Sequence, residues 1–257
     1  MKRIVVKVGS AVLTQDNLIA KERMLSLVAL IAKLKKKYDV ILVSSGAVAA
    51  GYGALRLDKS KHISKKAIAA AGQPILMSSY KSKFEIYGID TAQILLTEDD
   101  FDSRKRTKMI QDIMEKLLDN GIMPIVNEND ITATSDQLFG DNDQLSANIA
   151  YMTDAHLLVI LSDIDGYFDK NPKEYEDAQI RKIVQELSEE ELEAKSTANS
   201  EFATGGIVTK LKAANFLMQR GKKMLLANGF NLKATEEFLL ENNHTLGTLF
   251  VPKKEQK

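Results

Sequence analysis

Short apolar runs rich in β-branched residues alternate along this chain with segments of helical spacing. The strand-like runs cover residues 4–8, 39–43, 91–96, 122–126, 155–161, 222–226 and 247–250. Helical segments are expected at 21–37, 67–87, 103–120, 144–153, 188–191, 233–240 and from the 204–210 loop through 220. This alternation predicts an α/β fold, a three-layer α-β-α sandwich around a mostly parallel sheet. Without a linker or internal repeat, residues 1–257 are predicted to form one domain.

Composition excludes several classes of protein. The 257 residues carry 35 Lys+Arg and 35 Asp+Glu, so no general nucleic-acid partner is expected. No apolar run is long enough to span a bilayer, and Met1 leads into a strand instead of a signal peptide, which predicts a cytoplasmic protein without a membrane partner. Cysteine is absent and the three histidines lie far apart, so no protein-bound metal is predicted.

Glycine-containing turns follow several predicted strands. Lys7 lies near the end of the first strand, before Gly9-Ser10, and Ser45-Gly46 and Thr204-Gly205-Gly206 are two further turns of this kind. In open α/β sheets ligands bind outside the carboxyl ends of the strands, so the Lys7 ammonium would face a bound anion. The alternative is a lysine that protects an edge strand from aggregation. Neither the dinucleotide fingerprint nor the P-loop pattern is present.

Two polar segments also follow predicted strands. Residues 127–143 are too polar for a core and too long for a simple turn, and Ser162-Asp163 ends the 155–161 strand. Residues 53–66 are basic and are expected to form a mobile surface loop. Taken singly, Ser45, Asp130 and Asn142 fit helix capping or turn formation as well as ligand binding.

Five motifs in order along the chain resemble the amino acid kinase family. They are Lys7-Val8-Gly9-Ser10, Val43-Ser44-Ser45-Gly46-Ala47, Asn127-Glu128-Asn129-Asp130, Gly140-Asp141-Asn142-Asp143 and Thr204-Gly205-Gly206-Ile207-Val208-Thr209-Lys210. The pairing of Ser-Gly-Ala with Asn-Glu-Asn-Asp and Gly-Asp-Asn-Asp is the most specific part. It resembles the members that phosphorylate the side-chain carboxylate of glutamate.

The resemblance implies transfer of the γ-phosphoryl group of ATP to L-glutamate, the first step of proline biosynthesis. A carboxylate with a pKa near 4 is ionised at neutral pH and needs no general base. By resemblance Lys7 and Lys210 flank the transferred group, Asp143 holds both lysines, and Mg²⁺ bridges the ATP phosphates.

The resemblance also assigns the two substrate sites. Asp130 is expected to pair with the α-ammonium of glutamate, and Asn142 and Ser45 to donate to its carboxylates. Gly46 and Asn127 complete that set. The nucleotide is assigned to Lys7, Gly9, Ser162, Asp163, Thr204, Gly205, Gly206, Ile207, Val208, Thr209 and Lys210.

Two departures from the family pattern stand out. Phe168 stands where a tyrosine is usual, so adenine recognition would be altered if that hydroxyl contacts the base or ribose. The RNA-binding-type PUA domain of many bacterial members is expected to be absent, since the matched motifs leave no room for it before Lys257. Feedback inhibition by proline is expected, with residues 130–140 as the sensing loop. The resemblance further implies a homo-oligomer, dimer or tetramer, and hand-over of the product to glutamate-5-semialdehyde dehydrogenase.

Two alternatives remain open at this point. One is a sister kinase of the same fold, acting on N-acetylglutamate, aspartate or UMP. The other is a non-catalytic sensor of an amino acid or nucleotide, although a sensor would not need Lys7, Lys210 and Asp143.

Overall fold

A central sheet organises the computed structural model, which describes residues 1–133, 142–193 and 206–253. Among these residues, eight strands form the sheet in the order β5-β6-β4-β1-β7-β9-β10-β8. Their bounds are β1 Lys2–Val8, β4 Tyr38–Ser44, β5 Thr91–Leu96, β6 Met123–Glu128, β7 Leu157–Ser162, β8 Ile183–Val184, β9 Met224–Asn228 and β10 Thr248–Phe250. A separate hairpin pairs β2 (Thr14–Gln15) with β3 (Leu18–Ile19).

The sheet is parallel except at one pair. β10 runs antiparallel to β9, and the other paired strands run parallel. β1 lies between β4 and β7, with Val8 in register with Ser44 on one side and Leu161 on the other. The edge-strand interpretation of Lys7 is therefore wrong, because its strand is paired on both sides and buried.

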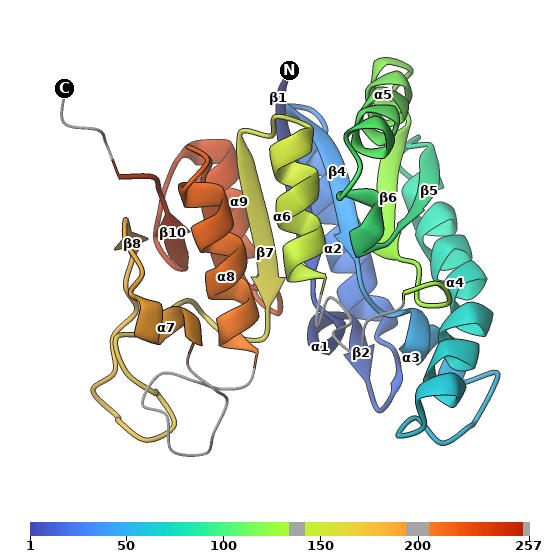
Figure 1. The fold of residues 1–257 in the computed structure, drawn as a ribbon, viewed down its shortest axis with the longest axis horizontal. Helices are drawn as coiled ribbons and strands as arrows, with labels where there is room; N and C mark the ends of the chain where they lie inside the picture. The colour runs from blue at the N-terminus through green and yellow to red at the C-terminus, as the bar shows by residue number, and fades with distance from the viewer. Residues whose placement is uncertain (134–141, 194–205, 254–257) are drawn as a thin grey trace.

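Helices cover both faces of the sheet, as Figure 1 shows. One face carries α1 (Ser10–Leu13), α2 (Lys21–Leu34), α3 (Ala47–Tyr52), α4 (His62–Glu85) and α9 (Lys233–Glu241). The other carries α5 (Arg104–Asp119), α6 (Asp143–Met152), α7 (Glu189–Glu193) and α8 (Ile207–Met218). Each face has its own buried apolar cluster, so the predicted three-layer α-β-α architecture is confirmed.

The chain leaves the central strands in opposite directions. From β1 the chain passes through α2 to β4, toward one edge of the sheet. From β7 it passes through α8 to β9, toward the other edge. The two connecting helices cover opposite faces. In open α/β sheets such a reversal is the place where ligands bind, here at the carboxyl ends of β1 and β7.

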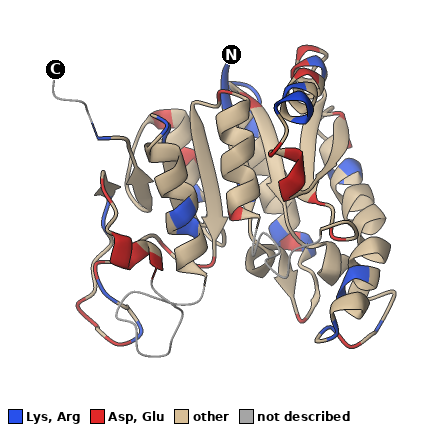
Figure 2. Ribbon diagram, in the orientation of Figure 1, with Lys and Arg blue, Asp and Glu red and all other residues tan. Residues whose placement is uncertain are grey.

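Charges of both signs are interspersed along the elements, with acidic residues gathered in α7 (Figure 2). Of the helices that the structure describes, none combines the length and apolar character needed to cross a bilayer.

Several local predictions can be compared with the structure. The capping box at Ser188 is confirmed, since its hydroxyl accepts from the Glu191 N–H and the Glu191 carboxylate accepts from the Ser188 N–H. In contrast, α4 begins at His62, inside the segment expected to be a loop. β6 also continues through Asn127 and Glu128, which are buried strand residues instead of part of a loop.

Candidate active site

Two lysines from distant parts of the chain meet at one buried carboxylate. Lys7 Nζ lies 2.8 Å from Asp143 Oδ1, and Lys210 Nζ lies 3.2 Å from Asp143 Oδ2. All three residues are buried: Lys7 is 0% exposed, Lys210 is 3% exposed and Asp143 is 1% exposed. An aspartate held between two ammonium groups fixes the direction of both, which is the arrangement that the sequence predicts.

The fold explains why these residues share one face. Side chains alternate along a strand, so Lys7 points to the same face as Val5, toward the layer that contains α6 and α8. Asp143 is the first residue of α6, and Lys210 lies in the first turn of α8. The two helices therefore present their first turns to the end of β1.

Asp143 remains ionised despite its burial. Burial alone would raise the pKa of its carboxyl group, but the nearby Lys7 and Lys210 ammonium groups hold that pKa below its ordinary value. The Thr209 hydroxyl also donates to Asp143 Oδ2 at 2.8 Å. The Thr209 side chain thus supports the carboxylate, while the sequence assigned this residue to the nucleotide.

The Lys7 ammonium keeps donor capacity for a ligand. Apart from Asp143, its Nζ has no polar partner among the described residues. A Cβ atom added at Gly9 would lie 3.6 Å from this Nζ, so glycine leaves the approach to the ammonium open. The Gly9 N–H itself donates to the Leu161 carbonyl at 3.1 Å and does not face a ligand.

An amide cluster lies beside the lysines and includes three residues that the sequence assigned to glutamate. Asn142 Nδ2 donates to Asn127 Oδ1 at 2.9 Å and to Ser45 Oγ at 3.3 Å. Asn127 Nδ2 in turn donates to Gln73 Oε1 at 2.8 Å. Because Asn142 uses its nitrogen in this cluster, its Oδ1 is the atom left for a ligand, so Asn142 would accept a hydrogen bond from the ligand instead of donating one.

Gln73 was not among the residues predicted from sequence. It lies in α4 and is 9% exposed, 54 residues before its partner Asn127. Its neighbours along the helix, Ala69 and Leu76, are apolar and buried. A glutamine on the apolar face of a helix is the sequence signal that would have identified it.

Gly46 and Ser45 form the turn between β4 and α3. Gly46 has a φ of 109°, a conformation that residues with a Cβ rarely adopt, and it precedes the first residue of α3. The Ser45 hydroxyl does not cap this helix, since the N-cap position is Gly46 and has no side-chain cap.

The remaining predicted site residues are placed as follows. Asp130 follows β6, where burial raises the pKa of its carboxyl group and Lys65 and Lys66 of α4 partly oppose that shift. Ser162 ends β7 and its hydroxyl donates to Asp163 Oδ1 at 3.0 Å. Gly206, Ile207 and Val208 begin α8. Thr204 and Gly205 lie outside the described residues.

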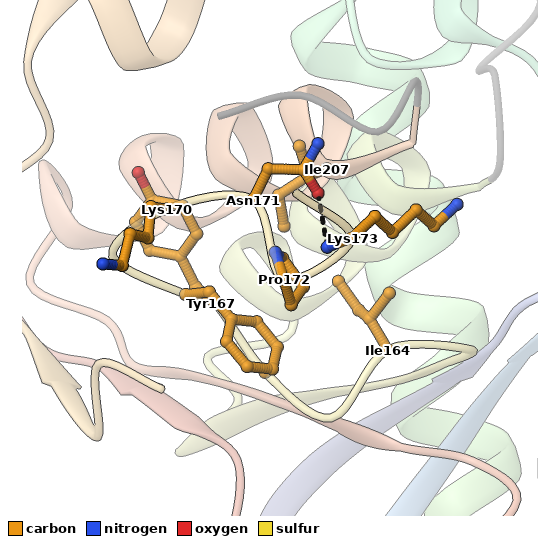
Figure 3. A pocket seen from close by; sticks show the side chains of 9 residues that line it. Ile164, Tyr167, Lys170, Asn171, Pro172, Lys173 and Ile207 are labelled. Carbon is orange, nitrogen blue, oxygen red and sulfur yellow. Dashed lines mark hydrogen bonds between the residues drawn. The ribbon is translucent and has the colours of Figure 1, made fainter. Parts of the chain in front are cut away.

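A small pocket adjoins the first turn of α8. Its lining comes from the segment after β7 and from Ile207, and Figure 3 shows Ile164, Pro172 and Ile207 around it. Lys170 and Lys173 extend to either side. Phe168, where the family pattern has tyrosine, also lines this pocket. The wall is largely apolar and suits a flat aromatic ring.

The site thus comprises three features: a pair of buried ammonium groups held at Asp143, an amide cluster that includes the neighbouring Asn142, and an apolar pocket beside the first turn of α8. Residues 2–228 match the family model described as "Amino acid kinase family". The chain belongs to the amino acid kinase family.

Its curated relatives narrow the class further. The chain is 56% identical to the glutamate 5-kinase of Wolinella succinogenes, covering 98% of this chain and 98% of that protein. It is 52% identical to the glutamate 5-kinase of Leishmania donovani, covering 97% of this chain and 95% of that protein.

A solved structure shares the fold at much lower identity. Carbamate kinase from Giardia lamblia bound to AMP-PNP superposes with a TM-score of 0.67 and 14% identity, covering 98% of this chain and 99% of that chain. This likeness supports the fold assignment alone.

Proposed function

We propose that this chain transfers the γ-phosphoryl group of ATP to the side-chain carboxylate of L-glutamate, giving L-glutamyl 5-phosphate. The observation that most supports this proposal is that the Lys7 and Lys210 ammonium groups both contact the Asp143 carboxylate. The two curated relatives described above, both glutamate 5-kinases, support the choice of acceptor. The product is the first intermediate of proline biosynthesis.

The reaction requires two anions to approach each other. An ionised γ-carboxylate oxygen of glutamate attacks the γ-phosphorus, and the bond to the β,γ-bridging oxygen breaks to release ADP. Because the carboxylate is already deprotonated at neutral pH, no proton has to be removed. Lys7 and Lys210 supply the positive charge that offsets the approach, and Asp143 fixes where that charge lies.

Nucleotide and substrate would occupy different parts of the crevice. The pocket lined by Ile164, Phe168 and Ile207 would hold the adenine ring, with the triphosphate extending along the first turn of α8 toward Lys210. Ser162 and Asp163, at the end of β7, lie at the carboxyl edge of the sheet beside this region. Ser45, Gly46, Asn127, Asp130 and Asn142 would hold glutamate.

Mg²⁺ would be held mainly by the phosphates of ATP. Asp143 has both carboxylate oxygens engaged by lysines, and the described residues contain no group of three His, Cys, Asp or Glu able to bind a metal. When bound, the ion would add charge neutralisation at the phosphate oxygens.

The finer predictions on regulation and assembly extend this proposal. They are inhibition by proline through the 130–140 loop, a homo-oligomer, a cytoplasmic location and transfer of the labile acyl phosphate to glutamate-5-semialdehyde dehydrogenase. Residues 134–141 of that loop lie outside the described residues. Shortening the loop should abolish proline inhibition, and inhibition that persists would contradict the assignment.

A coupled ADP-release assay with hydroxylamine tests the proposed activity. Hydroxylamine converts acyl phosphates to hydroxamates, so ATP and glutamate should yield hydroxamate and ADP. Aspartate, N-acetylglutamate and UMP are the comparison acceptors. ADP release with one of these and none with glutamate would establish a sister kinase, and no turnover with any acceptor would favour a sensor.

A further inference from the structure

Four side chains form a chain of hydrogen bonds that ends in α4. The hydrogen bonds run from Ser45 and Asn142 to Asn127 and then to Gln73. All four are buried, with exposed fractions of 4% to 9%. Two of its atoms, Gln73 Nε2 and Asn142 Oδ1, are buried without a hydrogen-bond partner among the described residues. Unpaired buried polar atoms are costly, so a ligand that pairs with them would be favoured.

Backbone groups fix which way each amide points. The Glu128 N–H can only donate, and it donates to Asn127 Oδ1 at 2.9 Å. The Asn127 nitrogen must therefore face Gln73 and donate to its Oε1. Gln73 is left with a free donor, its Nε2.

The other end of the chain is fixed in the same way. The Ser44 carbonyl can only accept, and it accepts from Asn142 Nδ2 at 3.3 Å. The unpaired atom of Asn142 is therefore an acceptor. The cluster offers one donor and one acceptor, which suits a ligand that carries both a carboxylate and an ammonium group.

We infer that Gln73 is a further substrate-binding residue, whose Nε2 donates to the α-carboxylate of the amino-acid substrate. The inference rests on the proposed glutamate kinase activity. Asn142 directly precedes Asp143, whereas Gln73 lies two hydrogen bonds further from the lysines, through Asn127. Gln73 thus lies at the end of the cluster away from phosphoryl transfer. That end suits the α-carboxylate, because the γ-carboxylate must reach Lys7 and Lys210.

Gln73→Glu is the sharpest variant for this inference. A glutamate at this position still accepts from Asn127, but it replaces the donor with a second acceptor that repels a carboxylate. We expect the KM for glutamate to rise about 10- to 100-fold. The KM for ATP should change less than about twofold, since adenine and phosphates bind elsewhere. Gln219→Glu, at the exposed C-cap residue that follows α8, is the matched control.

A substrate analogue separates a contact from a structural effect. 4-Aminobutyrate keeps the reacting carboxylate and the ammonium of glutamate but lacks the α-carboxylate. Its inhibition constant against glutamate should be the same in the wild type and in Gln73→Glu. An equal loss of affinity for glutamate and 4-aminobutyrate would overturn the assignment of Gln73.

Two further measurements make every outcome decisive. If Gln73→Glu fails to fold in thermal unfolding, Gln73→Met removes the donor without adding charge and should show the same selective loss for glutamate. Hydroxamate formation by the wild type is measured first. A wild type inactive with glutamate overturns the proposed function and this inference with it, whereas an active wild type with an unselective Gln73 variant overturns only the inference.

Discussion

A Cβ atom added to Gly51 of α3 would lie 2.8 Å from the backbone nitrogen of Gly72 in α4. A Cβ added to Gly72 would lie 1.8 Å from the carbonyl oxygen of Ala47. The backbones of α3 and α4 therefore touch, which only glycine permits at these two positions. This contact holds Gln73, the residue after Gly72, within reach of Asn127.

Gly72→Ala is expected to destabilise the fold and weaken glutamate binding together. The added methyl group meets backbone atoms that cannot rotate away, so we expect a loss of about 1–3 kcal/mol or more in the free energy of unfolding. Denaturant unfolding and the KM for glutamate measure the two effects. Gly53→Ala is the control, because its Cβ would meet only the end of the Leu18 side chain, at 3.3 Å. Equal stability of the two variants would contradict the close contact.

Lys7→Ala and Lys210→Ala should each lower turnover by at least about 100-fold while the protein still folds. Each removes one of the two ammonium groups held at Asp143, and the other still compensates the carboxylate. The measurement is kcat from ADP release, with circular dichroism as the check on folding. Lys222→Ala removes an ion pair between Lys222 and the exposed Asp154 and should leave kcat unchanged. Unchanged turnover in either site variant would remove that lysine from the mechanism.

The order of strands and helices was predictable because each strand is a short apolar run and each helix has an apolar face. The sequence could not predict the start of α4 at His62, since Lys61, Lys65 and Lys66 make that region resemble a surface loop. In the structure Lys66 Nζ donates to the carbonyls of Ile131 and Ala133, after β6, so the start of α4 is tied to the rest of the fold. Tertiary packing here overrides local composition.

The site was predictable where its residues belong to motifs of the amino acid kinase family. Lys7 and Asp143 belong to recognisable motifs, and the meeting of the carboxyl ends of parallel strands brings such motifs together. Asn127 and Glu128 resembled loop residues, because polar side chains at the end of a buried strand look the same in sequence as the start of a loop. Gln73 was missed because its bond to Asn127 joins residues 54 positions apart.

The apolar pocket leads to a prediction about the nucleotide. Ile164→Asp should raise the KM for ATP at least about tenfold, because a carboxylate in its wall would have to lose its water when the adenine ring binds. The KM for glutamate should stay unchanged. Ile63→Asp, at a side chain that is 76% exposed, is the matched control and should alter neither constant. An unchanged KM for ATP in Ile164→Asp would place the adenine ring elsewhere.

Asp130 should make glutamate binding sensitive to acid. Burial raises the pKa of its carboxyl group above the ordinary value, against the opposing effect of Lys65 and Lys66. If its ionised form binds the α-ammonium, the KM for glutamate should rise as the pH falls through this raised pKa, at a higher pH than for an exposed aspartate.

The raised pKa of Asp130 weakens glutamate binding in acid, but it makes the folded state more stable there. The folded state binds more protons than the unfolded state between the ordinary pKa and the raised one, so this carboxyl group lowers the free energy of unfolding as the pH rises through that interval. Asp130→Asn should remove both effects. Its KM for glutamate should be higher at neutral pH and should not rise further in acid, and its free energy of unfolding should depend less on pH. Steady-state kinetics and urea unfolding measure them over a pH range that begins at the ordinary aspartate pKa of about 4. If Asp130→Asn keeps the acid-dependent rise in KM, another group binds the ammonium, because an amide cannot titrate in this range.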